Sequence, residues 1–272
     1  MTIKETLDWA SKQLKSSCER PLFEAELLLA YHLHKKRIYL HSHENDVVEN
    51  TEIFESLIAR RASHEPYEYI VGKTSFYDIE LFVKQGVLIP RPETELLIDE
   101  VSSIIKKEHI TSIAEIGIGS GAISIVLARK FPSLKIIATD ISLDAIAIAR
   151  RNIEAFELSD QITLVNTNLL DDIEVPVQLV VSNPPYIARD ALLESNVIDY
   201  EPHTALFGGE RGDELLKQII TQVKQKNISY LACEMGYDQK ASMELFLTQL
   251  GVQYTKFYDD LAGLDRGFIT KF

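Results

Sequence analysis

The spacing of apolar positions divides the chain into a helical part and a longer part in which strands and helices alternate. Over the first 72 residues apolar side chains recur every three or four positions, which places one apolar face on each helix. The repeat is clearest in Ile3, Leu7, Ala10 and Leu14. Further helical segments begin at Pro21 and Thr51. The pattern predicts a small all-helical domain over residues 1–72.

Residues 73–90 change to a pattern typical of strands. An apolar and aromatic run over residues 76–83 is followed by Lys84–Gly86 and a second apolar run, Val87–Ile89. Two such runs around a glycine-containing turn indicate a β-hairpin. We therefore expect a hairpin linker between two domains.

From residue 91 to residue 272 strands and helices alternate, starting with a helix that Pro92 opens. Amphipathic helical segments lie between the expected strands. Such alternation predicts an α/β domain with a largely parallel sheet that helices cover on both faces. The expected strands are Ser112–Ile116, Lys135–Thr139, Ile162–Val165, Leu179–Ser182, Tyr230–Glu234, Gln253–Phe257 and Phe268–Lys271.

Composition narrows the class of protein. The formal net charge is −13, from 41 acidic and 28 basic residues, whereas a free-standing duplex-DNA binder usually carries a basic footprint. The two cysteines and the histidines have no ligands at metal spacing, so no metal is expected. The N-terminus lacks the layout of a signal peptide, and no apolar run approaches the ~20 residues that span a bilayer. We expect a cytoplasmic protein.

A glycine-rich turn follows the first strand of the α/β domain. Gly117-Ile118-Gly119-Ser120-Gly121 lies between a strand and a helix, where glycines allow a tight turn and a close ligand. The same glycine pattern also occurs in dinucleotide-binding sites and in turns that bind no ligand, so it leaves these alternatives open. Asp140 ends the next strand, 19 residues after Gly121, where a carboxylate can accept both ribose hydroxyls. NAD and S-adenosylmethionine both carry that ribose, but Glu115 favours a ligand with an ammonium and a sulfonium.

The segment Asn183-Pro184-Pro185-Tyr186 directly follows the strand Leu179–Ser182. Consecutive prolines end a strand ladder and stiffen the backbone, which predicts a rigid loop at the ligand-binding end of the sheet. The Asn183 side-chain oxygen and the Pro184 carbonyl can each accept one hydrogen of a planar NH2 group. The nitrogen lone pair then turns toward an incoming methyl group. The ring of Tyr186 can pack on the flat face of the target and near a sulfonium.

These four residues, with the stretch EIGIGSGAIS, resemble the amino-methyltransferases, which act on adenine N6, cytosine N4 or glutamine amides. Other segments resemble one family in particular: Phe76–Val83, Leu88–Glu95, Tyr200–Leu206 and Glu234–Gly236. Over nearly its whole length the chain resembles the peptide chain release factor N5-glutamine methyltransferases (HemK or PrmC type). That resemblance implies a seven-stranded, Rossmann-like class I methyltransferase sheet, a hairpin connector and a helical domain that docks the substrate.

The resemblance also implies a reaction and a partner. S-adenosyl-L-methionine would methylate the N5 amide of the glutamine in the Gly-Gly-Gln motif of class I release factors. S-adenosyl-L-homocysteine would be the product formed from the donor, and the methylation would tune translation termination. The expected enzyme is a monomer that contacts neither nucleic acid nor membrane.

Site residues follow by resemblance at matching positions. Gly117, Ile118, Gly119, Ser120 and Gly121 would hold the donor, with Asp140 on its ribose. Asn183 would lie between donor and substrate, and Pro184, Pro185 and Tyr186 would form the glutamine pocket. The expected catalytic residues are Asn183, Pro184 and Tyr186.

Two features of the expected site differ from the family or stay open. Near the adenine the family often has an acidic residue followed by an aromatic one, whereas this chain has Asn168 and Leu169. Either of these could make the adenine contact. Glu201 and Glu234 have either a substrate or a structural role.

Three rival functions use the same motifs. A DNA or RNA amino-methyltransferase would need a basic and aromatic region to hold a flipped base, and no large insertion supplies one. A methyltransferase for a ribosomal-protein glutamine is a closer rival that composition does not separate. A nucleotide-binding regulator without catalysis would differ in lacking donor turnover.

Overall fold

The computed structural model describes residues 1–272, and the chain separates into two compact units. Unit 1 comprises Met1–Lys73 and Leu193–Tyr200, and unit 2 comprises Thr74–Leu192 and Glu201–Phe272. The sequence suggested a helical domain over residues 1–72 alone, whereas in the structure Leu193–Tyr200 also belongs to unit 1. Within unit 1, the Tyr200 hydroxyl donates a hydrogen bond to the carbonyl oxygen of Ser63 at 2.6 Å.

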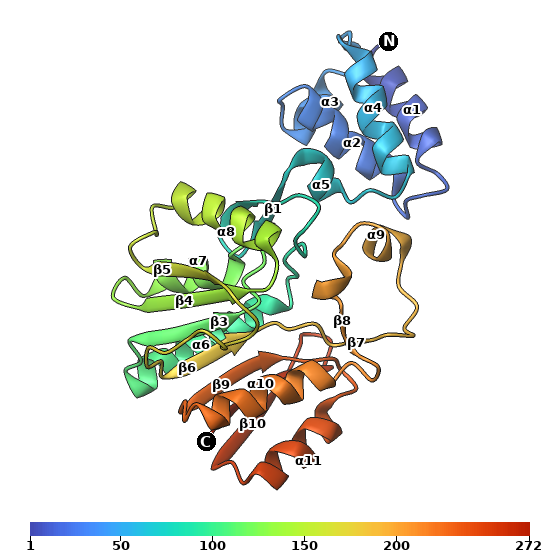
Figure 1. Ribbon diagram of the computed structural model, residues 1–272. Helices are drawn as coiled ribbons and strands as arrows, with labels where there is room; N and C mark the ends of the chain where they lie inside the picture. The colour runs from blue at the N-terminus through green and yellow to red at the C-terminus, as the bar shows by residue number, and fades with distance from the viewer. The chain divides into compact units, whose positions relative to one another are not determined.

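Unit 1 is built from helices (Figure 1). A capping box starts the first one: the Thr2 hydroxyl accepts from the Glu5 amide at 3.2 Å, and the Glu5 carboxylate accepts from the Thr2 amide at 2.9 Å. The helices are α1 (Ile3–Gln13), α2 (Pro21–His32), α3 (Arg37–Ser42), α4 (Thr51–Ala62), α5 (Tyr67–Val71) and α9 (Ser195–Ile198). The apolar faces of α1, α2 and α4 meet in one core around Leu28 and Phe54, as the periodicity predicted.

The hairpin forms earlier in the chain than the sequence suggested. Its strands are β1 (Lys73–Phe76) and β2 (Ile79–Phe82), so the turn falls at Tyr77 and Asp78 and not at Lys84–Gly86. Tyr77 adopts a left-handed φ of 55°. Its amide donates to the Glu95 carboxylate at 2.8 Å, a tertiary contact that the local pattern does not contain. The predicted position of the turn was therefore wrong.

Unit 2 contains a mixed sheet of seven strands in the order β10-β11-β9-β6-β3-β4-β5. The five strands from β9 to β5 run parallel, whereas β11 pairs antiparallel with β9 and with β10. This sheet confirms the predicted fold class. The strands are β3 (Ser112–Ile116), β4 (Lys135–Asp140), β5 (Ile162–Asn166), β6 (Leu179–Ser182), β9 (Tyr230–Glu234), β10 (Tyr254–Asp259) and β11 (Asp265–Lys271).

Helices cover both faces of the sheet, which explains why its central strand β6 is continuously apolar and buried up to Ser182 (Figure 1). One core cluster joins the sheet to α6 (Thr94–Glu108), α7 (Ala122–Lys130) and α8 (Leu143–Ala155). The other joins it to α10 (Glu214–Gln225) and α11 (Lys240–Leu250). No helix has the combined length and apolar character that crossing a bilayer requires.

The order of the strands reverses between β3 and β6, which places a crevice at their carboxyl ends. Ile116, the last residue of β3, pairs in register with Ser182 of β6 and with Thr139 of β4. The glycine turn after β3 and the proline loop after β6 therefore leave the sheet at the same level. Beyond the proline loop, β7 (Ile187–Ala188) pairs with β8 (Phe207–Gly209) in a separate two-stranded sheet.

Candidate functional site

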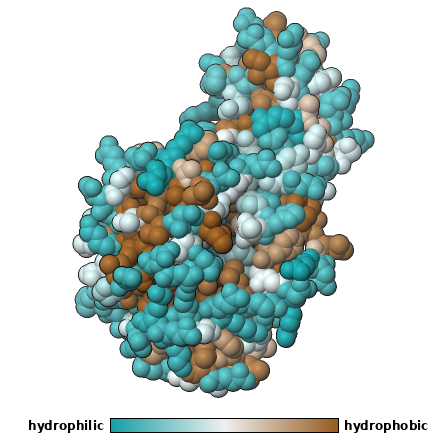
Figure 2. Space-filling view, viewed as in Figure 1, coloured by the Kyte–Doolittle hydropathy of each residue, from teal (hydrophilic) through white to brown (hydrophobic).

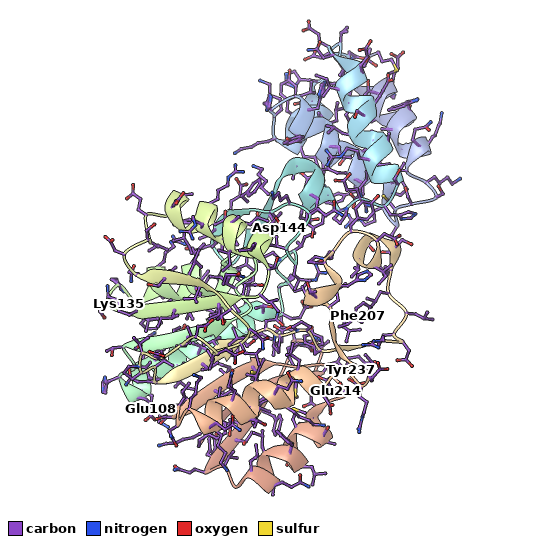
Figure 3. All side chains as sticks on the ribbon, viewed as in Figure 1. Glu108, Lys135, Asp144, Phe207, Glu214 and Tyr237 are labelled. Atoms are coloured by element: carbon purple, nitrogen blue, oxygen red, sulfur yellow. The ribbon has the colours of Figure 1, made fainter.

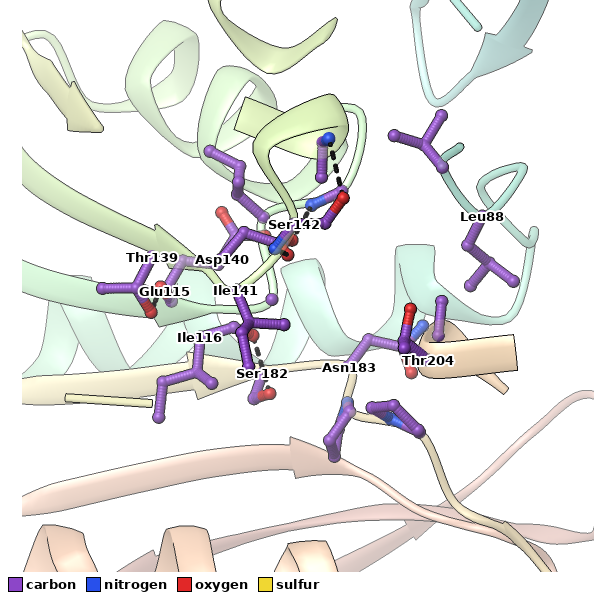
Figure 4. Close-up of a pocket in the computed structure, with 18 of the residues that line it drawn as sticks. Leu88, Glu115, Ile116, Thr139, Asp140, Ile141, Ser142, Ser182, Asn183 and Thr204 are labelled. Atoms are coloured by element: carbon purple, nitrogen blue, oxygen red, sulfur yellow. Dashed lines mark hydrogen bonds between the residues drawn. The ribbon is translucent and has the colours of Figure 1, made fainter. Parts of the chain in front are cut away.

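A cavity of about 370 Å³ opens at the carboxyl ends of β3, β4 and β6 (Figure 4). This volume lies within the range of about 300–1,000 Å³ that small-molecule sites occupy. All of its lining residues belong to unit 2. The main walls are Gly86–Leu88, Glu115–Ser120, Thr139–Ser142, Thr167–Leu169, Ser182–Pro185 and Pro202 with Thr204 and Ala205.

The glycine turn forms the wall of the cavity beside β3. Gly117 and Gly119 have φ values of 76° and 55°, which side chains rarely adopt. A Cβ at either position would meet no atom within 4 Å. The backbone conformation therefore favours glycine at both positions, and the space beside them is open to a ligand. Ile118 and Ser120 also line the cavity, whereas Gly121 does not and instead is the N-cap residue of α7.

Asp140 is held at the end of β4 by two backbone amides. Its Oδ2 accepts from Gly119 at 3.1 Å, and its Oδ1 accepts from Ser142 at 2.9 Å (Figure 4). Burial raises the pKa of this carboxyl, although the amide hydrogen bonds act in the opposite direction. Ser142 caps α8 by accepting from the Ala145 amide at 3.2 Å.

Glu115 lines the cavity from inside β3 and is only 1% exposed. Its carboxyl accepts a hydrogen bond from the Ser124 hydroxyl. Burial, together with the nearby charge of Asp140, raises the pKa of Glu115 to about 8. A cation bound in the cavity would favour the ionised form of this carboxyl.

Asn168 and Leu169 both line the cavity after β5. The side-chain amide nitrogen of Asn168 donates to the Asp171 carboxylate at 3.3 Å, and Leu169 has a left-handed φ of 49°. The exposed side chain of Ile141 adds apolar surface to the lining. On the face seen in Figure 2, apolar surface (brown) gathers over the middle of unit 2.

The proline loop after β6 is held from several sides. The Ser182 hydroxyl donates to the Ile116 carbonyl at 2.8 Å, and the side-chain amide nitrogen of Asn183 donates to the Thr94 hydroxyl at 2.9 Å. A Cβ on Gly208 would lie 2.4 Å from the carbonyl oxygen of Pro185, so only glycine fits there. Asn183, Pro184 and Pro185 line the cavity.

Tyr186, the fourth residue of the motif, is not among the lining residues. Its hydroxyl donates to Glu234 Oε1 at 3.1 Å, and its carbonyl accepts from Gln239 Nε2 at 2.8 Å. Glu234 is buried, and burial raises its pKa to about 7. Burial and the Glu234 carboxylate raise the pKa of Tyr186. A contact between the Tyr186 ring and the substrate stays a prediction.

A buried carboxylate, Glu201, lies beside the wall of the cavity that begins at Pro202. Glu201 accepts from Arg91 Nη2 at 2.5 Å and from the Ile89 amide at 3.2 Å. The wall continues through η1 (His203–Ala205) to β8, and Figure 3 shows Phe207 on that strand. Glu201 therefore has structural contacts within unit 2.

The sequence pattern assigned no individual role to Thr94 or Gln239. Thr94 lies within the segment Leu88–Glu95, but its partners Asn183 and Glu234 are 89 and 140 residues away. To predict these contacts from sequence, one would need positions that vary together across related proteins.

Solved structures share the fold of most of the chain. The catalytic domain of hMettl16 in complex with the MAT2A 3'UTR hairpin 6 has a TM-score of 0.59 at 22% identity, covering 71% of this chain and 75% of that chain. The N-terminal domain of human METTL16 in complex with SAH has a TM-score of 0.54 at 21% identity, over 71% and 75%. These similarities concern the fold alone.

Family and sequence comparisons cover more of the chain. Residues 5–72 match the PrmC N-terminal domain, and residues 92–199 match the methyltransferase small domain. The release factor glutamine methyltransferase of Dictyoglomus turgidum is 40% identical over 85% of this chain and 83% of its own length. That of Clostridium acetobutylicum is 33% identical over 98% and 97%. The chain belongs to the release factor glutamine methyltransferase family.

Proposed function

We propose that the protein transfers a methyl group from S-adenosyl-L-methionine to the side-chain amide nitrogen of the glutamine in the Gly-Gly-Gln motif of class I release factors. The observation that carries this proposal is the orientation of Asn183. Its Nδ2 is engaged by Thr94, and the residue lines the cavity at the end of β6.

The cavity fits the chemistry of the methyl donor. Open space beside Gly117 and Gly119 suits a ligand that approaches the backbone, and Asp140 offers carboxylate oxygens to ribose hydroxyls. Glu115 offers a carboxyl to a cationic group. The proposed donor contacts also include Ile118, Ser120 and Asn168. When bound, S-adenosylmethionine supplies an electrophilic methyl group.

Asn183 and Pro184 then orient the acceptor. The Asn183 Oδ1 accepts one hydrogen of the substrate amide, and the Pro184 carbonyl accepts the other. This arrangement turns the nitrogen lone pair toward the methyl group, so catalysis is mainly positioning. The methylated nitrogen loses a proton to water, and no strong base is needed. Pro185 forms the neighbouring wall for the glutamine, and Tyr186 continues it.

The helical unit has a proposed role of its own. The match of residues 5–72 to the PrmC N-terminal domain supports its use in docking the release factor. We propose that the enzyme acts in the cytoplasm as a monomer, without direct contact with nucleic acid or membrane.

The test is transfer of labelled methyl from S-adenosylmethionine to purified bacterial release factor. A Gly-Gly-Ala release factor, a ribosomal-protein fraction and unmethylated DNA run in parallel. We expect label on the intact release factor and none on the alanine variant. Label only on DNA or on the ribosomal fraction would overturn the proposed partner.

A further inference from the structure

Four side chains from three segments form a continuous hydrogen-bonded chain that starts at the cavity, which Asn183 and Thr94 both line, and leads away from it. Asn183 Nδ2 donates to Thr94 Oγ1 at 2.9 Å, and Thr94 Oγ1 donates to Glu234 Oε2 at 2.8 Å. The Tyr186 hydroxyl donates to the other oxygen of Glu234 at 3.1 Å. Thr94 and Glu234 are 4% and 1% exposed, so water does not replace these bonds.

The direction of these bonds decides which end of the Asn183 amide faces the cavity. A threonine hydroxyl has one proton, and Thr94 donates it to Glu234. Thr94 therefore offers only an acceptor to Asn183, which must present its NH2 group. A flipped amide would set two acceptors against each other, and the side-chain shape alone would not prevent that flip.

Glu234 holds the far end of the chain because a carboxylate accepts from Thr94 and Tyr186 at once. Burial raises the pKa of Glu234 to about 7, whereas the hydrogen bonds from Thr94 and Tyr186 and the charge of Arg266 favour its ionised form. One carboxylate thus orients the side chains at both ends of the Asn183–Tyr186 loop.

We propose that Thr94 and Glu234 are positioning residues that keep the Asn183 side-chain oxygen directed at the substrate amide. This role rests on the proposed function of Asn183. Neither residue needs to touch the substrate: Thr94 acts through Asn183, and Glu234 acts through Thr94 and Tyr186.

Thr94→Val removes the hydroxyl with little change in shape, and Thr94→Ser keeps it. We expect Thr94→Val to lower the single-turnover transfer rate about 10- to 100-fold at saturating donor, because Asn183 loses its fixed orientation. Donor affinity should stay within about threefold of wild type, and Thr94→Ser should retain most of the rate.

The control Thr270→Val removes another buried hydroxyl, on β11, and should leave the rate unchanged. Wild-type rate in Thr94→Val, or equal loss of rate and donor affinity, would overturn the proposal.

A measurement without turnover separates this proposal from the proposed function. The side-chain ¹⁵NH2 resonance of Asn183, assigned by its loss in Asn183→Asp, should exchange slowly in wild type and Thr94→Ser and faster in Thr94→Val. Unchanged exchange in Thr94→Val would refute the positioning role even if release factor is methylated. Failure of wild type to methylate release factor, with the expected exchange pattern, would refute only the proposed function.

Discussion

Glu201 and Arg91 form an ion pair with 2.5 Å between Oε1 and Nη2, although 110 residues separate them in the sequence. The Glu201 side chain is 2% exposed and that of Arg91 is 33% exposed. The pair joins the segment after the hairpin, where Pro90 lines the cavity, to the segment after Tyr200, where Pro202 lines it. A structural role for Glu201 follows from these contacts.

Glu201→Ala should lower the free energy of unfolding by about 1–3 kcal/mol, because the Ile89 amide and Arg91 lose a buried acceptor. Urea denaturation measures the change. The matched control is Arg189→Ala, which breaks an ion pair whose side chains are 71% and 69% exposed and should cost little. Equal effects of the two substitutions would contradict the buried role.

Asn183→Ala should remove most methyl transfer while donor affinity stays within about tenfold of wild type, since the lost interaction acts mainly in the transition state. Single-turnover rates and calorimetric donor binding measure the two effects separately. Parallel loss of both would show that Asn183 chiefly binds the donor.

Asp140→Asn should weaken donor binding about 10- to 100-fold. The substitution removes the charge, and its NH2 group would face a backbone N–H of Gly119 or Ser142. Equilibrium binding of S-adenosylhomocysteine checks this result. Asp144→Asn, on exposed helix surface two residues beyond Ser142, is the control and should bind normally.

Glu115 should make stability depend on pH. Its folded pKa of about 8 lies above its ordinary value of 4.5, so between these values the folded state holds a proton that the unfolded state has lost. Its contribution is full below pH 4.5 and declines as the pH rises to about 8. Glu115→Gln should remove this decline, which has a limiting slope of about 1.4 kcal/mol per pH unit. Denaturation at several pH values tests it, and an unchanged slope in the variant would refute the assignment.

Local patterns in the sequence were sufficient for much of unit 2. The strand Leu179–Ser182 and the largely parallel α/β fold were predicted correctly, because the periodicity of apolar positions depends on residues close in sequence. The positive φ values at Gly117 and Gly119 agree with the turn that the glycines indicated. The roles of the individual site residues stay predictions.

The partnerships between distant side chains depend on packing. The hairpin turns at Tyr77, where Glu95 accepts the backbone amide, and the Tyr186 hydroxyl bonds to Glu234. Asn183 meets Thr94 only because the start of α6 packs near the end of β6. Such contacts join residues many positions apart, so they follow from how the chain closes on itself and from no local pattern. Local sequence therefore specifies the elements and the chemistry of their loops, and the packing of those elements specifies which side chains orient one another.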